Sequence, residues 1–589
     1  MTKKQIKVKV DGRIYYGKEG QSILNFLTEK GFKIPALCHH PDLKIKANCR
    51  VCLVEVKGCD KLLTSCSNFI KEGMEIYTSS EKVKKARQIN IELLYASHME
   101  KCPTCSFRFD CNLLKFAKEY KLKINRFPDR KNNRPTYKFG SAIEIDGSQC
   151  IDCDNCVESC QLQGISFLEK DQYGINQEIK AVKDYKKTCV FCGQCTLHCP
   201  VAACQEQDSV IPVEKMLKEK KKILVAQIAP AVRVSLGESF SYDYGVNVEN
   251  EIYTALKKLG FNYVFDVNFG ADITTMVEAE ELVERMSNKK AVWPMITSCC
   301  PAWVAFVEFY HPDLIKNLTT ARSPHIHNAA AIKTYYAKKL NIKASDIYLV
   351  SIMPCTAKKE EKERVQHKYE GLKLVDEVLT TREFAYLLKK NNIDLVKLNK
   401  NEGKEFFFNG SGAAAIYGAS GGVMESALRS VSYFLGSEKR NKKINNKIKS
   451  LKKNDLSSNL EFKSVRGLEG VKEAEVVVMD KKLKIAVVSG LKNVENLIPK
   501  LSKYHYVEVM ACPGGCIGGG GQPIPTTKQI VQKRMKALYQ IDKKREVRRA
   551  HENQEMLECY QFLKNDKKRA KLLHTDYKKS KRLLVKKTK

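Results

Sequence analysis

The sequence predicts a multidomain α/β protein. The chain has 589 residues, and a single hydrophobic core stops growing at about 250–300 residues, so several domains are expected. Cysteines cluster in three separate stretches of the first 217 residues. From about residue 218, β-forming segments alternate with helical patterns, as they do in α/β folds. These changes of pattern predict the domains 1–80, 81–140, 141–217 and 218–589.

The 23 cysteines could form disulfides in a secreted protein or bind metal. Two observations favour metal. The N-terminal segment MTKKQIKVKVDGRIYY lacks the apolar core of a signal peptide, and the chain has no stretch of 18 or more apolar residues. The cysteines also recur at spacings of two and three residues, which suit metal ligation. We expect a soluble, cytoplasmic protein without membrane insertion.

Residues 1–80 begin with the alternating strands IKVKV and RIYY around Asp11-Gly12, which suits a type I′ turn. A helical segment, SILNFLTEKG, ends at Gly31. A C-x2-C pair with one cysteine well before it and one well after is similar to the plant-type [2Fe–2S] ferredoxins. The four candidate ligands are Cys38, Cys49, Cys52 and Cys66. Zinc stays an alternative, because four thiolates also hold Zn²⁺.

Residues 81–140 have a helical, basic pattern and a second set of candidate ligands, which are His98, Cys102, Cys105 and Cys111. Three cysteines leave one iron of a [4Fe–4S] cubane without a protein ligand. His98 lies one helical turn before Cys102 and can fill that position. The alternative is an ordinary surface or core histidine.

Residues 141–217 contain a doubled motif. The first run is Cys150, Cys153, Cys156 and Cys160, and the second is Cys189, Cys192, Cys195 and Cys199. In bacterial ferredoxins with this spacing, the fourth cysteine of each run binds the other cluster. One cubane would therefore take Cys199 from the second run, and the other would take Cys160 from the first. Two adjacent redox cubanes are typical of an electron-transfer chain, and a purely structural role is the alternative.

Within residues 218–589, KKILVAQIAP and FNYVFDVNFG are predicted strands and TTMVEAEELVERMS is a predicted helix. Residues 436–460 are rich in Lys, Asn and Ser and predict a surface insertion. The segment from 526 onward is predicted to be helical, with fraying last residues.

Three cysteine-containing segments in this domain each follow a β-forming run. They are TSCCPAW after AVWPMI, MPCTAKK after IYLVSI, and EVMACPGGCIGGGGQP after YHYVEV. Ligands of open α/β sheets gather beyond the carboxyl ends of the strands, so these loops are expected to converge on one site. That site would hold Cys299, Cys300, Cys355, Cys512 and Cys516. Four thiolates suffice for a cubane, which leaves one cysteine for another task.

These loops and the upstream cysteine arrays closely resemble the [FeFe]-hydrogenases of the monomeric clostridial type, over essentially the whole chain. The resemblance implies a β-grasp [2Fe–2S] ferredoxin-like domain, a small His/Cys₃ cluster domain, a bacterial two-[4Fe–4S] ferredoxin domain and a large α/β catalytic domain. It implies one [2Fe–2S] cluster, three accessory [4Fe–4S] clusters and the H-cluster. The H-cluster is a [4Fe–4S] cubane bridged to a diiron subsite with CO, cyanide and azadithiolate ligands.

By the same resemblance, Cys300, Cys355, Cys512 and Cys516 would hold the H-cluster cubane, with Cys516 bridging to the diiron subsite. Lys358 could donate a charged hydrogen bond to a cyanide. Met353 and Met510 would pack around the diiron unit. The run Gly518–Gly521 would let backbone approach the cluster closely.

Cys299 would pass protons to a relay whose matching family positions are Glu278, Thr319, Glu281 and, near the surface, Arg285. A solvated helix face is the alternative for the two glutamates. Threonine replaces the usual serine at 319. Ala231, Pro513 and Tyr417 also depart from residues common in the family, and they bear on redox tuning and oxygen tolerance rather than on the reaction. Cys59, Cys204 and Cys559 match no cluster motif and are expected to be small buried hydrophobes.

The resemblance implies a ferredoxin hydrogenase of anaerobic hydrogen metabolism that catalyses 2H⁺ + 2e⁻ ⇌ H₂. Its partners would be an acidic ferredoxin or similar electron carrier and the maturation proteins that supply the diiron subsite. Two other classes share parts of the pattern: the iron–sulfur subunit of respiratory NADH dehydrogenases and the hydrogenase-like proteins of cytosolic iron–sulfur assembly. A further alternative is the hydrogenase subunit of a multimeric NAD(P)-linked or bifurcating complex.

The formal net charge of +35 raises the possibility of nucleic-acid binding. Iron-bound thiolates would remove on the order of ten charge units, and the lysines are dispersed along the chain. We therefore expect a generally solvated basic surface and no nucleic-acid partner, with docking of acidic proteins as the alternative.

Overall fold

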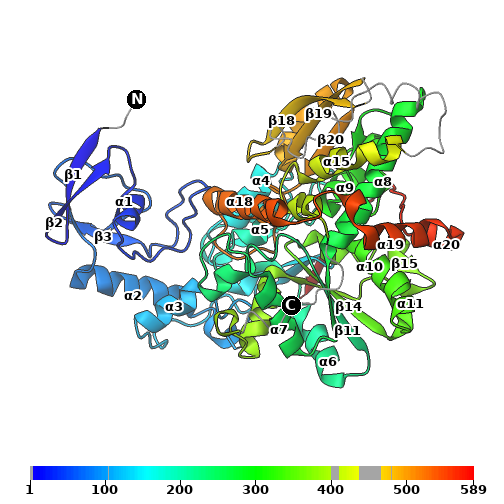
Figure 1. Ribbon diagram of the computed structural model, residues 1–589. Coiled ribbons are helices and arrows are strands. Elements are labelled where there is room, and N and C mark those ends of the chain that lie inside the picture. Colours follow the sequence, from blue (N-terminus) through cyan, green and yellow to red (C-terminus); the bar gives the residue numbers. More distant parts are fainter. Residues whose placement is uncertain (1–3, 104, 399–409, 437–465, 479–480, 589) are drawn as a thin grey trace.

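The computed structural model describes residues 4–588 except 104, 399–409, 437–465 and 479–480. The insertion predicted at 436–460 lies outside the described residues, apart from its first residue. Figure 1 shows a small N-terminal unit that projects from a much larger body, with the helices α2 (Glu81–Tyr95) and α3 (Asn112–Glu119) beside it. None of the described helices is long and apolar enough to cross a membrane.

The N-terminal unit is a five-stranded sheet of order β2-β1-β5-β3-β4 with one helix. Its elements are β1 (Gln5–Val10), β2 (Arg13–Lys18), α1 (Ile23–Glu29), β3 (Leu53–Val56), β4 (Leu63–Thr64) and β5 (Glu75–Tyr77). The predicted hairpin is confirmed, because β1 pairs with β2 across Asp11 and Gly12, which have φ values of 45° and 86°. Positive φ at both central residues is the requirement of a type I′ turn.

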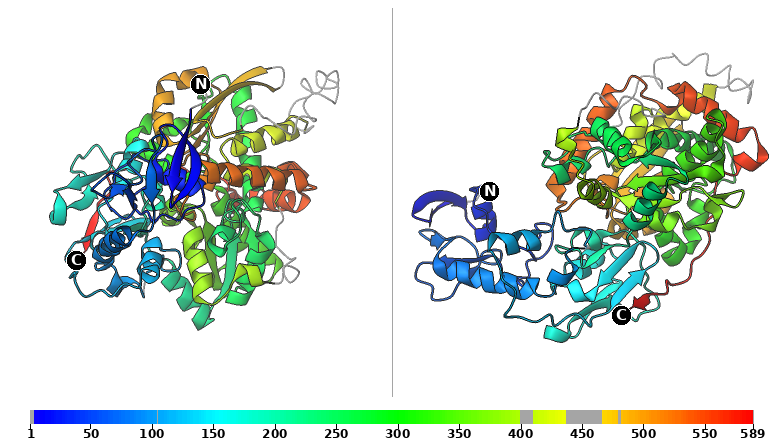
Figure 2. Two further views of the ribbon diagram at one scale, coloured as in Figure 1. Left: turned by 90° about the vertical axis from the view of Figure 1, so that its left-hand side faces the viewer. Right: turned by 90° about the horizontal axis from the view of Figure 1, so that it is seen from below.

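The doubled-cysteine region combines strands from three parts of the chain. Its elements are β6 (Thr136–Phe139), β7 (Ile143–Asp146), α4 (Asn155–Leu162), β8 (Leu168–Asp171), β9 (Glu178–Ala181), α5 (Gln194–Leu197) and β10 (Cys204–Glu206). The sheet order is β10-β7-β6-β21, where β21 is Lys586–Thr588. Strand β6 therefore lies before the predicted boundary at 140. The fraying predicted for the last residues is wrong for β21, which pairs with β6 (Figure 2).

The large body contains two four-stranded sheets. The first, of order β12-β11-β14-β17, is wholly parallel and contains β11 (Ile223–Ile228), β12 (Tyr263–Asp266), β14 (Ile347–Met353) and β17 (Glu377–Thr380). The second, of order β13-β20-β19-β18, contains β13 (Met295–Ile296), β18 (Val471–Val478), β19 (Lys481–Ser489) and β20 (Tyr506–Met510). Only β18 is antiparallel to its neighbour in this second sheet.

Helix α8 (Val267–Ser287) packs on the cores of both sheets. Its N-terminal half contributes Ile273 to the core that holds β11 and β14, and its C-terminal half contributes Leu282 to the core that holds β19 and β20. The sequence prediction of a strand through FNYVFDVNFG is wrong after Asp266. The Asp266 carboxylate accepts a hydrogen bond from Asn268 N and so caps the helix there.

The remaining elements surround these sheets in Figures 1 and 2. They are α6 (Val210–Glu219), α7 (Glu249–Leu259), α9 (Pro301–Tyr310), α10 (Pro324–Ala331), α11 (Ala337–Lys339), α12 (Ala357–Glu361), β15 (Lys368–Tyr369), β16 (Leu372–Lys373), α13 (Thr381–Lys390), α14 (Gly412–Ala415), α15 (Gly422–Gly436), α17 (Leu491–Leu497), α18 (Lys528–Lys544), α19 (Gln554–Lys564) and α20 (Lys567–Ala570). The helical prediction from 526 onward is correct as far as α20.

Candidate active site

The three cysteine loops converge beyond the carboxyl ends of strands from both sheets. They follow β13 and β20 in one sheet and β14 in the other. Their cysteines line one cavity of about 80 Å³, and these residues are Cys299, Cys300, Cys355, Cys512 and Cys516. One water needs roughly 10–15 Å³ on the same measure, so the cavity can hold a larger group. The site is thus assembled between two sheets rather than at the edge of one.

The cavity wall is mostly apolar. Met353 and Met510 line it, as do Ala231 and Tyr417, two of the three departures from the family pattern. The Tyr417 hydroxyl lies 2.9 Å from Thr275 Oγ1, so its polar end has a partner beside the cavity. Pro513, the third departure, is not among the lining residues.

The chemistry of the donor set fits an iron–sulfur cluster. Burial raises the pKa of all five thiols, to about 12 for Cys355, so the ionised form needs compensating positive charge. Cys300 caps the N-terminus of α9, and Cys355 lies just before α12. Backbone N–H groups at these helix starts stabilise the two thiolates and partly offset burial. Bound iron would supply the rest.

Lys358 is the cation closest to the cysteines of the cavity wall. Its Nζ lies 2.7 Å from Glu361 Oε2 and 3.4 Å from the carbonyl oxygen of Cys299. Burial opposes its charge, but Glu361 outweighs burial and the pKa of Lys358 is raised. His325, which lines the cavity, has Nε2 3.0 Å from Glu361 Oε2. Sequence reasoning identified neither Glu361, the partner of Lys358, nor His325, the second partner of Glu361. The i, i+3 spacing from Lys358 could have indicated Glu361, whereas no pattern indicated His325.

Glu278 is fully buried on α8, which contradicts the alternative of a solvated face. Its Oε1 accepts a hydrogen bond from Thr319 Oγ1 at 3.2 Å, and its Oε2 accepts one from Tyr506 OH at 3.0 Å. Burial raises the pKa of Glu278 to about 8, although these two hydrogen bonds lower it. Ser298, next to Cys299, lies 2.8 Å from Thr319 Oγ1 through its hydroxyl. Sequence reasoning did not identify Ser298, inside TSCCPAW, or Tyr506, inside YHYVEV, because no local pattern marks a hydroxyl as part of this hydrogen-bond network.

Glu281 lies one helical turn further along α8 and is partly exposed. Its Oε1 accepts a hydrogen bond from Arg285 Nη2 at 2.6 Å. Its Oε2 accepts one from the backbone N–H of Thr320 at 2.9 Å. Consecutive threonines therefore contact the two glutamates, Thr319 the inner one and Thr320 the outer one.

Most of the glycine run Gly518–Gly521 packs against other loops of the protein and not against the cavity. A Cβ on Gly520 would lie 2.5 Å from Gly193 Cα and 2.7 Å from the carbonyl oxygen of Cys192. A Cβ on Gly519 would meet Pro354 O. Only Gly519 of the run lines the cavity. The glycines thus allow the loop that carries Cys512 and Cys516 to contact the turn that carries Cys192.

The cysteines of the two runs lie close to one another. Burial, followed by the charges of Cys199 and Cys150, raises the pKa of Cys153. In the second run, burial and the charges of neighbouring cysteines, Cys160 of the first run among them, raise the pKa of Cys189. The fourth cysteine of each run thus lies among the first three of the other. Cys512 Sγ is 3.9 Å from the carbonyl oxygen of Cys192, so the second group adjoins the cavity.

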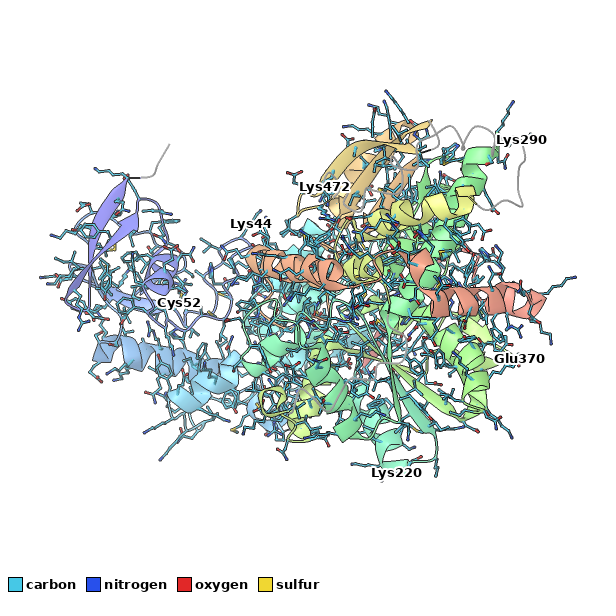
Figure 3. The ribbon with its side chains drawn as sticks, viewed as in Figure 1. Lys44, Cys52, Lys220, Lys290, Glu370 and Lys472 are labelled. Atoms are coloured by element: carbon cyan, nitrogen blue, oxygen red, sulfur yellow. The ribbon has the colours of Figure 1, made fainter. Side chains whose placement is uncertain are left out.

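The other candidate ligands are also buried or partly buried. His98 is 5% exposed, burial lowers its pKa to about 4, and its Nε2 has no hydrogen-bond partner among the described residues. A neutral imidazole with an unpartnered nitrogen suits a ligand. In the N-terminal unit, where Figure 3 labels Cys52, the Cys49 backbone N–H lies 3.5 Å from Cys38 Sγ. Within the described residues, no three His, Cys, Asp or Glu side chains converge closely enough for a single metal ion.

The three spare cysteines differ in environment. Cys559 is fully buried in the core, as expected. Cys59 is partly exposed, with Sγ 3.3 Å from Lys61 O, so the prediction of burial is wrong there. Cys204 is buried, but its backbone N–H lies 3.3 Å from Cys199 Sγ and its thiol contacts Cys195, so it adjoins both groups of the doubled motif.

The chain matches four family models in order. They describe a 2Fe-2S iron-sulfur cluster binding domain (residues 3–81), a 4Fe-4S dicluster domain (149–203), the iron only hydrogenase large subunit, C-terminal domain (222–520), and the iron hydrogenase small subunit (528–580). The third model alone covers about half of the chain.

Similar proteins agree with these models. Iron hydrogenase 1 of Clostridium pasteurianum is 37% identical over 97% of this chain and 99% of its own length. The NADP-reducing hydrogenase subunit HndD of Solidesulfovibrio fructosivorans is 35% identical over 98% of this chain and all of its own length. A solved [FeFe]-hydrogenase of Chlamydomonas reinhardtii has 32% identity and a TM-score of 0.54, and the match covers 63% of this chain and 99% of that chain. The chain belongs to the iron-only hydrogenases, oxidoreductases that act on hydrogen.

Proposed function

We propose that this chain catalyses 2H⁺ + 2e⁻ ⇌ H₂ at the cavity and exchanges electrons through accessory clusters. The observation that carries this proposal is the convergence of five cysteines with Lys358, Met353 and Met510 on one buried, mostly apolar cavity. An iron-only hydrogenase needs such a set, four thiolates for the cubane and one thiol beside it.

The proposed ligands of the H-cluster cubane are Cys300, Cys355, Cys512 and Cys516, with Cys516 at the bridge to the diiron subsite. When bound, this group supplies the reversible reduction of protons to hydrogen. The nearby apolar residues restrict access of water, and Met353 and Met510 offer polarizable contacts. Lys358 presents a charged donor, held in place by Glu361.

Cys299 is assigned to hold and release a proton at its Sγ. The proton would then pass to Glu278, which is protonated below about pH 8 and so can give a proton and take one back. Thr319, hydrogen-bonded to Glu278 Oε1, would connect this inner carboxyl toward the Thr320–Glu281 contact. In this assignment Arg285 positions Glu281.

Four accessory clusters would carry electrons. The exchanged double motif would hold two [4Fe–4S] clusters, His98 with Cys102, Cys105 and Cys111 a third, and Cys38, Cys49, Cys52 and Cys66 a [2Fe–2S] cluster. The last electron transfer would pass from the Cys192 group to the cavity, since Cys512 Sγ and Cys192 O are 3.9 Å apart.

Acidic ferredoxin is the proposed electron carrier, and dedicated maturation proteins would insert the diiron unit. The second candidate is the hydrogenase subunit of a multimeric NAD(P)-linked complex. The 35% identity to a protein named as a subunit of an NADP-reducing hydrogenase supports this candidate. Co-purification of native protein from its source, followed by mass spectrometry, separates the two: a stable set of partner chains favours the complex.

Infrared spectroscopy of CO-inhibited, maturated protein tests the reaction. Bands of iron-bound CO and cyanide are expected, together with about 20 iron atoms per chain. Protein made without maturation enzymes should contain about 18 and lack these bands. Iron near zero with stoichiometric zinc would contradict the whole assignment.

A further inference from the structure

A chain of hydrogen bonds continues beyond Glu281 to a histidine on the surface. Thr320 Oγ1 lies 3.1 Å from Glu281 Oε2, and His574 Nδ1 lies 2.9 Å from Thr320 Oγ1. Backbone contacts hold this arrangement. Thr575 N donates to Thr320 O at 2.8 Å, and Ala321 forms a β-bridge with His574. The segment after α20 therefore fixes the imidazole beside the outer glutamate.

The direction of these hydrogen bonds follows from the groups that make them. A carboxylate can only accept, so the Thr320 hydroxyl donates its single proton to Glu281 Oε2. The hydroxyl oxygen must then accept from His574, which puts a proton on Nδ1 and leaves Nε2 as the acceptor of the ring. His574 also lines a cavity of about 800 Å³ whose wall includes charged side chains such as Glu360 and Lys571, and this volume is large enough for many waters.

Arg285, the other partner of Glu281, cannot itself transfer protons. A guanidinium stays protonated in proteins and accepts no hydrogen bond. Its Nη groups already point to Glu281 Oε1, to the Leu318 carbonyl oxygen at 3.1 Å and to the Val292 carbonyl oxygen at 3.0 Å. Imidazole, in contrast, gains and loses a proton near neutral pH.

We propose that Thr320 and His574 form the outer end of the proton relay, with His574 exchanging protons with water in the cavity of about 800 Å³ that it lines. This proposal rests on the proposed function for its inner end. For inward transfer, His574 Nε2 binds a proton from hydronium while Nδ1 passes its own to Thr320 Oγ1. Thr320 passes its hydroxyl proton to Glu281 Oε2. Each bond to hydrogen that breaks is replaced by one that forms, so one proton enters and no electron moves.

The charges around His574 are mixed. Glu280, Glu281 and Glu284 on α8 raise its pKa, and Lys564 on α19 lowers it. Arg322 Nε donates to the His574 carbonyl oxygen at 2.9 Å, and Lys571 lines the same cavity. Burial has the largest effect, and the pKa of His574 is lowered overall. A neutral ring near pH 7 has its Nε2 free to accept the next proton.

The first test compares His574→Ala and Thr320→Val with a matched control, His311→Ala. His311 is also a surface histidine against a carboxylate, with Nε2 3.1 Å from Glu495 Oε2, but it lies outside the relay. Hydrogen evolution driven by reduced methyl viologen should fall roughly tenfold in the first two variants and stay unchanged in the control. Added imidazole should restore much of the rate of His574→Ala and none of that of Thr320→Val, a pattern that loss of packing does not produce.

The second test needs no hydrogenase activity. Glu278 is protonated at neutral pH, so its carboxyl C=O stretch is an infrared marker, assigned by its loss in Glu278→Gln. In protein prepared without maturation enzymes, transfer to D₂O should shift this band more slowly in His574→Ala and Thr320→Val than in wild type or His311→Ala. Equal iron content and circular dichroism spectra check that each variant is folded.

The outcomes separate this proposal from the function on which it rests. Slower deuteration in both variants than in the His311→Ala control supports the outer relay, even in a protein that evolves no hydrogen. Wild-type deuteration rates in both variants overturn it, even where the maturated enzyme is active. A fall in activity without slower deuteration and without rescue also overturns it, because structure alone then explains the loss.

Discussion

At the scale of single residues, depth of burial decides which protonation state a side chain holds. Glu278 and Glu281 are three positions apart on α8, yet only Glu278 is fully buried. The inner carboxyl is buried because α8 packs on both sheet cores around it. Desolvation keeps a proton on Glu278 near neutral pH, and partial exposure lets Glu281 contact the surface. A proton relay needs both a buried carboxyl that holds a proton and a carboxyl that contacts the surface.

Cys299→Ser tests the inner proton donor. The serine hydroxyl is a far weaker acid than a thiol, so turnover should fall by orders of magnitude. Infrared and electron paramagnetic resonance spectra of the clusters should stay nearly unchanged, because Cys299 is not a proposed ligand. Wild-type turnover in Cys299→Ala would show that the proton route is wrongly assigned.

Glu278→Gln should change how stability depends on pH. In the folded chain Glu278 keeps its proton up to about pH 8, whereas the unfolded chain loses it near an ordinary pKa of about 4.3. The folded state therefore binds more protons between these values, and stability falls as pH rises through this window. A glutamine side chain does not titrate, so the Glu278→Gln variant does not lose stability in this way as pH rises.

Thermal unfolding at pH 5, 7 and 8.5 measures the effect. The midpoint of Glu278→Gln relative to wild type should rise with pH. A pH-independent offset would contradict the raised pKa. Hydrogen evolution should be low in Glu278→Gln at every pH, since an amide cannot shuttle a proton.

Residue types with a fixed spacing were predictable from sequence, and residues brought in by tertiary packing were not. The cysteines, Lys358 and Glu278 belong to motifs or match family positions. Tyr506 and His325 reach the site from a strand and a helix whose approach no local pattern encodes. Ser298 lies inside the TSCCPAW segment, but nothing local shows that its hydroxyl contacts Thr319. His574 comes from a segment more than 250 residues beyond Thr320 in the chain.

At the scale of elements, the boundary between strand and helix was the least predictable feature. FNYVFDVNFG is mostly apolar on both sides of Asp266, so periodicity alone does not show that Asp266 ends β12 and caps α8. The three cysteine loops were easier to predict, because cysteine and glycine runs are local features of the sequence. The arrangement of the loops in space was not predicted, since two sheets instead of one present them.

Gly520→Ala tests the contact between the Cys512–Cys516 loop and the Cys192 turn. The new Cβ would lie 2.5 Å from Gly193 Cα, and backbone on both sides leaves little room to adjust. We expect a loss of about 1–3 kcal/mol in stability and slower electron delivery, measured by thermal unfolding and by ferredoxin-driven hydrogen evolution.

Gly470→Ala is the matched control for this change. Its Cβ would meet the side-chain amide of Asn493, which can rotate away at the cost of its 2.7 Å hydrogen bond to Ser489 O, so a smaller effect than a clash with backbone is expected. Equal destabilisation by both substitutions would show that the two loops are not closely packed. A stability loss without slower electron delivery would show that the contact is structural only.

At the scale of the whole molecule, the basic surface predicts a salt-sensitive partner. The formal charge is +35, and the N-terminal unit projects from the body (Figure 1). This unit has exposed lysines such as Lys57. Attraction of an acidic ferredoxin is screened over a Debye length of about 8 Å at physiological ionic strength. Ferredoxin-driven hydrogen evolution should therefore fall steeply as salt is added.

Methyl viologen is the control for that measurement, because this small cation gains nothing from a basic surface. Its activity should not fall with salt. If both activities respond equally, the basic surface has no role in docking, and a permanent interface within a multimeric complex explains electron delivery better.

The N-terminal unit is also tied to the body by polar contacts. Lys44, labelled in Figure 3, donates its backbone N–H to Glu158 at 2.9 Å, and Lys46 forms an ion pair with the same carboxylate at 2.6 Å. Glu158 lies on α4, the helix inside the first run of the doubled motif. These contacts hold the N-terminal unit against the doubled-cysteine region.

The pairing of β21 with β6 has a consequence for biosynthesis. Thr588 and Thr136 lie opposite each other but are 452 positions apart in the chain. At about 5–20 residues per second, a ribosome needs roughly 20–90 s to make the intervening segment. During that time the β6 edge has no strand partner, and an open edge invites pairing with other chains. Nascent chains of this protein therefore pass through a window in which a chaperone, or early loading of the neighbouring clusters, has the most to contribute.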